Sequence, residues 1–256
     1  MNYGSHALLE RNLVGLALEL PGTAVVVMDN PTTTAEREAV TALCEQAGFL
    51  LTCPDVNVGF GAGVNAGVRR AMAAGTDTFL LLNPDAVIHA DAVCKLVDQV
   101  TADPYLLVSP LIERPDGSVW FAGTDLYLAT GIARSRLRRH QHPRGEVEPW
   151  LSGCCLAVTA ELWSHVGGFA DGYFMYWEDV DLSHRVVRAG GRLLVETGAV
   201  AVTRSAAPRV PPTPARNRGP TTSTTPATAC CSPRGTWPVG QCCGGPSGPY
   251  RPGGRS

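Results

Sequence analysis

Strand-like and helix-like stretches alternate along the first half of the chain, and this alternation limits the possible folds more than any other feature. Short apolar runs typical of buried strands occupy residues 24–28, 49–53, 78–83 and 106–110. Stretches with the composition of a helix follow the first three, at residues 34–48, 63–75 and 91–103. Repeated strand–helix units predict an α/β fold in which helices flank a mostly parallel central sheet.

The alternation stops near residue 205. The remaining stretch holds about half of the prolines, has no hydrophobic periodicity, and contains no Asp or Glu, the last acid being Glu196. Such a segment cannot bury enough apolar surface to offset the entropy that ordering it would cost. We therefore expect one globular domain over residues 1–205 and a disordered Pro/Gly/Thr/Arg-rich tail over residues 206–256.

Composition excludes several classes of protein. A formal net charge of −2 provides no overall positive field that would attract nucleic acid. No apolar run approaches the roughly 18 residues of a membrane-spanning helix. Glu10 and Glu19 interrupt the apolar N-terminal stretch, which predicts an amphipathic helix in preference to a signal peptide. The nine cysteines form no CxxC pair, which favours reduced thiols over a metal site or disulfides.

The first candidate site lies where a predicted strand ends. Asn83, Pro84 and Asp85 follow the apolar residues 79–82 at once. Ligands of parallel α/β sheets bind beyond the carboxyl ends of the strands, and Pro84 lacks the backbone donor that would continue the strand. A carboxylate in this position suits a hard cation that bridges diphosphate oxygens. An ordinary turn or helix-capping aspartate is the alternative, and this motif alone leaves both open.

The second candidate site is rich in glycine. Residues 57–68, NVGFGAGVNAGV, place four glycines within nine residues ahead of a helix, so that backbone N–H groups can approach a ligand closely. The same glycines fit the GxGxxA pattern of nicotinamide-dinucleotide-binding turns, but that pattern follows a strong first strand, which residues 53–58 do not resemble. Asn57 and Asn65 bracket the glycines and indicate polar recognition. A plain glycine-rich loop is the remaining alternative.

The third candidate site combines acids with aromatic residues. Glu178, Asp179 and Asp181 place three carboxylates over four positions, directly after Tyr173, Phe174, Tyr176 and Trp177. On a helix, Glu178 and Asp181 share a face, and Asp179 lies about 100° away from them. Helix capping needs only one acid. A carboxylate beside aromatic side chains gains a raised pKa from partial desolvation, which suits a general base.

Five stretches, taken in order, resemble the family 2 glycosyltransferases of GT-A fold, on their rhamnosyltransferase-like branch. They are VVVMDN (25–30), NVGFGAGVNAGV (57–68), LLLNPDAVI (80–88), WLSGCCLAV (150–158) and GGFADGYFMYWEDVDLSHRVVRAGGRLL (167–194). The resemblance implies a Rossmann-like nucleotide-diphospho-sugar transferase fold. It also implies transfer of a sugar, with rhamnose as one candidate, from a nucleotide-diphospho-sugar to a saccharide or polyprenyl-linked acceptor with inversion.

The resemblance further implies roles for individual residues. Asp179 matches the catalytic base. Asn83-Pro84-Asp85 occupies the family's DxD position, so that Asp85 matches the ligand of Mg²⁺ or Mn²⁺. Asp29 matches the acid that reads the nucleotide base. The other positions implied to bind the nucleotide are Tyr3, Asn57, Gly59, Gly63, Asn65 and Asn83. The positions implied to bind the acceptor or support the base are Glu178, Asp181, Trp177, Trp150 and Gly153.

The chain departs from the family pattern at both ends. The family has an apolar strand immediately before its counterpart of Asn2-Tyr3, and we expect that strand to be missing here. Where the family has a metal-binding histidine after the last strands, this chain has Arg204. Two alternatives therefore stay open, namely an impaired remnant that at most binds nucleotide sugar and, less favoured, an NAD-binding dehydrogenase. The resemblance implies a cytoplasmic protein, with peripheral attachment to the plasma membrane as an option, and no nucleic-acid partner.

Overall fold

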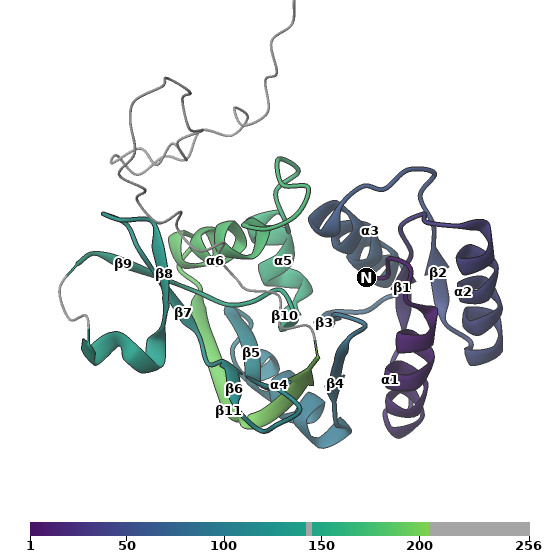
Figure 1. Ribbon diagram of the computed structural model, residues 1–256, viewed down its shortest axis with the longest axis horizontal. Helices are drawn as coiled ribbons and strands as arrows, with labels where there is room; N and C mark the ends of the chain where they lie inside the picture. The colour runs from purple at the N-terminus through teal and green to yellow at the C-terminus, as the bar shows by residue number, and fades with distance from the viewer. Residues whose placement is uncertain (142–144, 205–256) are drawn as a thin grey trace, which may run out of the picture. The chain divides into compact units, whose positions relative to one another are not determined.

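The computed structural model describes residues 1–141 and 145–204 (Figure 1). The predicted tail therefore lies outside the described residues. Helices and strands follow the alternation expected from the sequence. The helices are α1 (His6–Glu19), α2 (Thr34–Ala47), α3 (Phe60–Ala73), α4 (Ala90–Ala102), α5 (Ala160–Val166) and α6 (Glu178–Arg188), with the 3₁₀ helix η1 (Arg136–Gln141). The strands are β1 (Val26–Met28), β2 (Leu50–Thr52), β3 (Thr78–Leu82), β4 (Ala86–Ile88), β5 (Leu106–Glu113), β6 (Val119–Phe121), β7 (Thr124–Tyr127), β8 (Ile132–Ser135), β9 (Val147–Trp150), β10 (Cys155–Thr159) and β11 (Arg192–Thr203).

The largest sheet has six strands and is mixed. Its order is β3-β10-β5-β11-β4, with β6 paired to β5. Strand β10 runs antiparallel to both β3 and β5, and β4 runs antiparallel to β11, which leaves β5 and β11 as the parallel pair. The α/β class is confirmed, but the expectation of a mostly parallel sheet was wrong, because β10 enters the sheet between two strands that run the other way.

Both faces of this sheet are buried. On β10, Leu156 and Val158 pack into a cluster with α3, α5 and α6, while Cys155 and Ala157 pack into a second cluster with α4. The alternation arises because successive side chains of a strand point to opposite faces. Helices α3 and α6 themselves carry five of the predicted site residues, Gly63, Asn65, Glu178, Asp179 and Asp181, so they position that part of the site.

Strands β1 and β2 form a separate parallel pair. Asn2 continues this pair through an isolated parallel bridge to Asp29, in which the Asn2 N–H donates to the Met28 carbonyl at 2.6 Å. In the described residues no other strand pairs with β1 on that side, and none pairs with the outer edge of β3. Figure 1 draws the N-terminus between these two strands.

A second small sheet, in the order β8-β7-β9, stands beside α6. Thr124 of β7 pairs with Trp150, the last residue of β9, from which the chain leads straight to Gly153. The helix boundaries also follow local chemistry. Gly48 ends α2 in a left-handed conformation, as its position predicted, and Thr33 caps the start of α2 through its side chain. Within the described residues, every helix is too short or too polar to cross a bilayer.

Candidate active site

Helix α6 brings Asp179 to the segment that leads into β10, an inner strand of the six-stranded sheet. The Asp179 Oδ2 accepts a hydrogen bond from the Gly153 N–H at 3.0 Å, and its Oδ1 accepts one from the Val180 N–H at 2.9 Å. Asp179 lies in the first turn of α6, where the helix dipole favours a negative charge, and its side chain is only partly buried. The structure therefore holds the predicted base in one orientation while leaving it accessible.

Glu178, the neighbouring acid, has a different environment. It is 7 % exposed, and among the described residues its Oε2 atom has no hydrogen-bond partner. Its Cβ lies close to Gly61, and Phe169 packs against the same glycine. Burial, reinforced by the charge of Asp179, raises the pKa of Glu178 to about 7. The two predicted acids are thus distinguished by access, with Asp179 open to a substrate and Glu178 enclosed.

The strand end at Asn83-Pro84-Asp85 contacts the segment that contains Gly153. The Asn83 N–H donates to the Cys154 carbonyl at 3.0 Å, one residue from Gly153. The Asp85 Oδ2 accepts a hydrogen bond from the Thr203 hydroxyl at 3.2 Å. Asp85 lies in the turn between β3 and the short strand β4, which sequence reasoning had missed. Asp85 thus follows the carboxyl end of β3, as expected, and is partly buried, while its role as a metal ligand stays a prediction.

The glycine-rich stretch is more helical than expected. We expected α3 to begin at residue 63, but it begins at Phe60, so that Gly61 and Gly63 lie within it. Gly59 is the residue that requires glycine, because its φ is +81° and a Cβ there would lie 2.2 Å from the Phe174 carbonyl oxygen. The Asn57 Oδ1 accepts from the Gly59 N–H at 2.9 Å, which closes the turn before the helix.

Asn65 and Gly63 face the protein interior. The Asn65 amide donates to the Phe169 carbonyl at 2.7 Å and accepts from the Phe169 N–H at 2.9 Å. Both ends of this buried side chain are therefore engaged in fastening α3 to the chain beyond α5. A Cβ on Gly63 would meet the Met1 side chain at 2.7 Å. These contacts give the two residues a packing role, and their place in the nucleoside pocket stays a prediction.

Asp29 lies at the end of β1 as expected, in a buried polar cluster. Its Oδ2 accepts from Arg37 Nε at 2.9 Å and its Oδ1 from Asn2 Nδ2 at 2.8 Å. The next residue, Asn30, donates from Nδ2 to the Gly59 carbonyl at 3.2 Å and accepts from the Val58 N–H through Oδ1, also at 3.2 Å. Tyr3 is 59 % exposed beside this cluster. The cluster joins the end of β1 to the start of α3.

These parts form one continuous site. The Phe60 N–H donates to the Phe174 carbonyl at 2.9 Å, which ties the start of α3 to the loop before α6. A Cβ on Gly153 would lie 3.2 Å from the Phe60 ring and 3.6 Å from the Asp179 Cβ. Contacts therefore run from Asp29 through the start of α3 to Asp179, and from there through Gly153 to the strand end before Asp85.

The other predicted acceptor-side residues take different positions. Asp181 pairs with Arg185 at 2.8 Å, and Arg185 also donates to the Gly168 carbonyl at 2.7 Å, so Asp181 helps to fix α6. Trp150 is buried in the hydrophobic core against Phe121, with ring centroids 5.9 Å apart. Trp177, at 46 % exposure, is open to solvent.

Sequence reasoning missed three contributors, Asn30, Phe60 and Thr203. Asn30 was within reach, because it follows Asp29 in the quoted stretch VVVMDN. Phe60 and Thr203 carried no signal, since each acts only through contact with a residue far away in the sequence.

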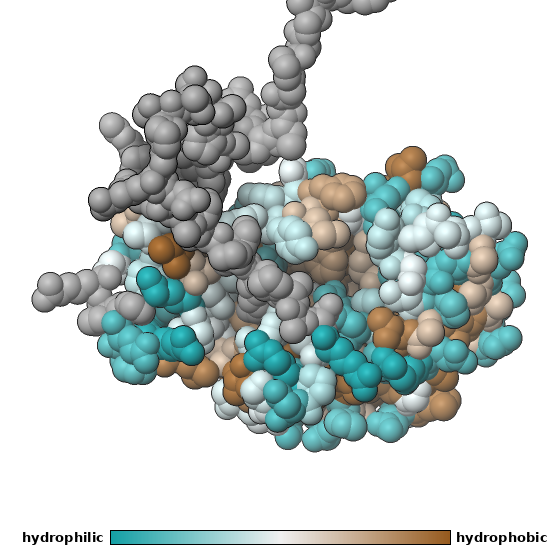
Figure 2. Space-filling view, viewed as in Figure 1, coloured by the Kyte–Doolittle hydropathy of each residue, from teal (hydrophilic) through white to brown (hydrophobic). Residues whose placement is uncertain are grey.

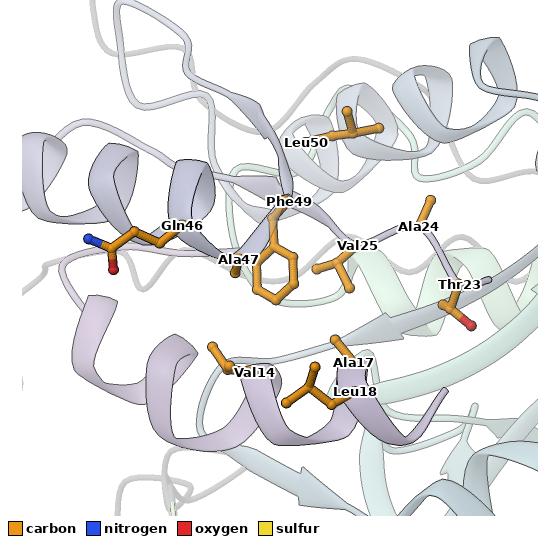
Figure 3. Close-up of a pocket in the computed structure, with 11 residues that line it drawn as sticks. Val14, Ala17, Leu18, Thr23, Ala24, Val25, Gln46, Ala47, Phe49 and Leu50 are labelled. Carbon is orange, nitrogen blue, oxygen red and sulfur yellow. The ribbon is translucent and has the colours of Figure 1, made fainter. Parts of the chain in front are cut away.

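A crevice of about 490 Å³ lies elsewhere, between α1 and the α2–β2 segment (Figure 3). It is lined by Val14, Ala17, Leu18, Thr23, Ala24, Val25, Gln46, Ala47, Gly48, Phe49 and Leu50. None of these residues is charged, and the crevice contains none of the predicted site residues. An uncharged, largely apolar lining is poorly suited to a diphosphate, so we do not place a nucleotide there.

Curated relatives of this chain include rhamnosyltransferases. The chain is 31% identical over 212 residues to the N-acetylglucosaminyl-diphospho-decaprenol L-rhamnosyltransferase of Mycobacterium tuberculosis, covering 71% of this chain and 67% of the relative. It is 27% identical over 149 residues to the rhamnosyltransferase WbbL of Escherichia coli K12, covering 53% and 56% of the two chains. A search of protein-family models found no match.

Solved structures share the fold at low sequence identity. A Pyrobaculum calidifontis mannosyltransferase in complex with GDP-Man and Mn²⁺ aligns with a TM-score of 0.55 at 21% identity, over 79% of this chain and 55% of that one. GalNAc-T7, with UDP, GalNAc and Mn²⁺, aligns with a TM-score of 0.56 at 13% identity, over 70% of this chain and 37% of that one. The chain thus spans between about a third and about half of the length of these structures. Taken with the rhamnosyltransferase relatives, the fold and the order of the motifs lead to one assignment. This chain belongs to the family 2 glycosyltransferases of GT-A fold, on the rhamnosyltransferase-like branch.

Proposed function

We propose that the chain transfers a sugar, with rhamnose as the first candidate, from a nucleotide-diphospho-sugar to a polyprenyl-linked saccharide with inversion. The observation that carries this proposal is the placement of Asp179. Its carboxylate is oriented by the Gly153 N–H and remains partly exposed. The residue after Gly153, Cys154, accepts a hydrogen bond from the Asn83 N–H at the end of β3. A base in this position lies between the acceptor side and the donor side of the site.

The chemistry requires a single displacement. The acceptor hydroxyl oxygen forms a bond to the anomeric carbon while its proton passes to the Asp179 carboxylate. The bond from the anomeric carbon to the diphosphate breaks, and its electron pair leaves with the nucleoside diphosphate. Because attack and departure occur on opposite sides of one carbon, the configuration inverts. Glu178 is enclosed and less accessible than Asp179, so we assign it a supporting role.

The donor would contact both halves of the site. We assign the base and nucleoside to Asp29, Tyr3, Asn57 and the start of α3 at Gly59, and the region of the diphosphate to Asn83. This assignment is supported by the hydrogen bonds that join Asn30, the residue after Asp29, to Val58 and Gly59. Trp177 and the backbone of Gly153 would border the acceptor.

Asp85 fits a divalent cation that arrives with the donor. Magnesium and manganese are held in such sites by one or two carboxylates together with substrate phosphates and water. Within the described residues there is no cluster of three His, Cys, Asp or Glu side chains that could hold a metal ion, so the donor would have to supply further ligands. Mg²⁺ or Mn²⁺ bound at Asp85 would neutralise charge on the leaving diphosphate. The neighbouring Thr203 hydroxyl would orient the Asp85 carboxylate.

The test is transfer itself. The purified chain is incubated with Mn²⁺, a polyprenyl-diphosphate-linked acetamido sugar, and in turn dTDP-rhamnose, UDP-sugars and GDP-sugars, and the anomeric configuration of any product is read by NMR. An inverted product from one donor supports the proposal. Donor binding by calorimetry without transfer to any acceptor would instead favour the impaired remnant, and a retained configuration would contradict the single displacement. The proposal places the enzyme at the cytoplasmic face of a membrane, where such a lipid-linked acceptor would be available.

A further inference from the structure

The loop that precedes α6 exposes large apolar side chains beside the predicted base. We call residues 173–177 the aromatic loop. The exposed fractions of four consecutive residues in it are 57 % for Phe174, 50 % for Met175, 69 % for Tyr176 and 46 % for Trp177. Single exposed apolar residues are common, but a contiguous run of this size marks an interaction surface. Figure 2 shows tan and pale surface, with little deep teal, around the place that this loop occupies in Figure 1.

The backbone holds these side chains outward. The Phe174 carbonyl is fixed by the Phe60 N–H at 2.9 Å and seats directly on Gly59, where no Cβ fits. Tyr176 and Trp177 are the two described non-glycine residues with positive φ, at 69° and 73°. A left-handed conformation costs a bulky residue roughly 1–2 kcal/mol. Exposed apolar groups in a strained, anchored segment are not explained by folding, and they point to a function.

The position of the loop next to Asp179, taken together with the proposed function, indicates which partner the loop contacts. A saccharide linked through diphosphate to a polyprenyl chain is tethered at the level of the lipid headgroups. Its reactive hydroxyl can meet Asp179 only if Asp179 comes close to the bilayer surface. The aromatic loop runs into Glu178 and Asp179 without an intervening residue, so it approaches that surface together with them.

We propose that the aromatic loop inserts into the interface of the lipid bilayer and so positions Asp179 over a membrane-tethered acceptor. The chemistry of its members fits this environment. Trp and Tyr rings favour the boundary between headgroups and acyl chains, where one end of the ring is apolar and the other is hydrated. Phe174 and Met175 supply apolar groups without polar atoms, which enter the acyl boundary.

Trp177 is a built-in probe for this docking. Trp150 and Trp163 are buried and Trp120 is partly buried, whereas Trp177 is nearly half exposed; Trp237 lies outside the described residues. The full-length chain is mixed with phosphatidylcholine–phosphatidylglycerol vesicles that contain no acceptor, with and without lipids brominated near the headgroup end of the acyl chains. We expect a blue shift of the emission and quenching by the brominated lipid, and we expect Trp177→Phe to lose most of the quenching.

Two further variants distinguish insertion of the aromatic loop from nonspecific binding to vesicles. Phe174→Ser combined with Met175→Ser should lower vesicle affinity by about tenfold or more. Leu18→Ser removes an apolar side chain that is 80 % exposed on α1, and it should leave vesicle affinity unchanged. Quenching of Trp177 by a soluble saccharide but not by brominated lipid would overturn the proposal, because the loop would then be a platform for sugar alone. Equal vesicle binding by the double variant and the parent chain would also overturn it.

Activity assays keep this inference distinct from the proposed function. The double variant should retain transfer to a short-chain, water-soluble acceptor and lose transfer to a full-length polyprenyl acceptor in vesicles. Equal loss on both acceptors would overturn the docking role. Absence of transfer by the parent chain in every assay would contradict the proposed function, and the quenching experiment, which needs no substrate, would still decide whether the loop enters a bilayer.

Discussion

At the start of α6, two adjacent carboxylates differ in what surrounds them. Asp179 accepts two backbone hydrogen bonds and is partly exposed, which keeps a carboxylate oriented toward a substrate. Glu178 is enclosed, and its pKa is raised to about 7 by burial and by the charge of Asp179. Neighbouring acids whose environments push their pKa values apart commonly take different chemical roles. Because their environments differ, we make a separate prediction for each of the two residues.

For Asp179, we expect Asp179→Asn to cut turnover by ~10²–10⁴, the usual contribution of a general base, with donor affinity nearly unchanged. Turnover is measured by product formation and donor affinity by calorimetry. Glu161→Gln, which changes an exposed acid on α5, serves as the matched control and should behave like the parent chain. If Glu178→Gln abolished turnover and Asp179→Asn did not, the base would be Glu178.

Glu178 should make stability depend on pH. Its pKa is about 7 in the folded chain against an ordinary value of 4.5, so the folded state binds the proton more tightly. The resulting stabilisation is complete below pH 4.5 and is lost as pH rises through 7. Glu178→Gln stays neutral, so relative to the parent chain it should gain about 1–3 kcal/mol between pH 5 and pH 8. Urea unfolding at the two pH values measures the difference, and a constant difference would contradict the prediction.

Asp85 is expected to act through the metal. Asp85→Asn should weaken Mn²⁺-dependent donor binding by about an order of magnitude or more, because a neutral amide is a poorer ligand for a hard cation. Thr203→Val removes only the hydroxyl that donates to Asp85, so its effect should be smaller. Calorimetry with and without Mn²⁺ provides the comparison. Unchanged metal-dependent affinity in Asp85→Asn, with an unchanged circular dichroism spectrum, would remove the metal role.

Among the secondary-structure elements, two glycines at helix ends allow two costs of replacing glycine to be compared. One cost is backbone strain, and the other is a clash with the aromatic loop where it contacts α3. Gly48 has the left-handed helical conformation (φ +69°, ψ +26°), whereas Gly59 has φ +81° and ψ −175°, a region open almost only to glycine, and only Gly59 has an atom in the way of a Cβ. Gly48→Ala should therefore cost about 1 kcal/mol of conformational strain. Gly59→Ala should cost more, because the Phe174 carbonyl must also move. Denaturant midpoints measure both, and equal losses would show that the loop is not seated on Gly59.

The sequence predicted the elements that depend on neighbouring residues, and it did not predict those that depend on residues far away in the chain. Local signals were sufficient for α2, whose end at Gly48 is a property of one residue, and for the strand that ends before Asn83. The mixed sheet was not predictable, because the direction of β10 depends on pairing with residues far away in the chain. Asn65 illustrates the same limit within the site, since its partner Phe169 is 104 residues away. From the sequence alone, a polar residue beside glycines indicated ligand recognition, and its packing partner could not be identified.

For the molecule as a whole, the important feature is that the strands form separate sheets. The edge of β1 opposite β2 is paired, within the described residues, only through the bridge to Asn2, and β3 is the outer strand of the six-stranded sheet. Met1 and Val26 nevertheless pack against the cluster that contains Phe79 and Leu81. A strand supplied between β1 and β3 would pair backbone groups on both edges. Each unpaired group costs about 1–3 kcal/mol if it stays buried, which is large beside the ~5–15 kcal/mol that stabilises a typical domain.

The Met1 amino group makes this prediction specific. Desolvation lowers its pKa from 8.0 to about 6, so the unfolded chain binds a proton that the folded chain does not, and stability should rise between pH 6 and pH 8.

In a version extended upstream by about ten residues, the length of a long strand, an amide replaces that amino group. We expect the extended chain to melt higher, to bind donor more tightly, and to lose the part of the pH dependence that arises from Met1. Melting curves of both versions at pH 6 and pH 8 test this. Equal melting temperatures and donor affinities would show that the two sheets need no strand between them. A large gain would show that any loss of activity measured for the 256-residue form arises from the sheet and not from Asp179 or Asp85.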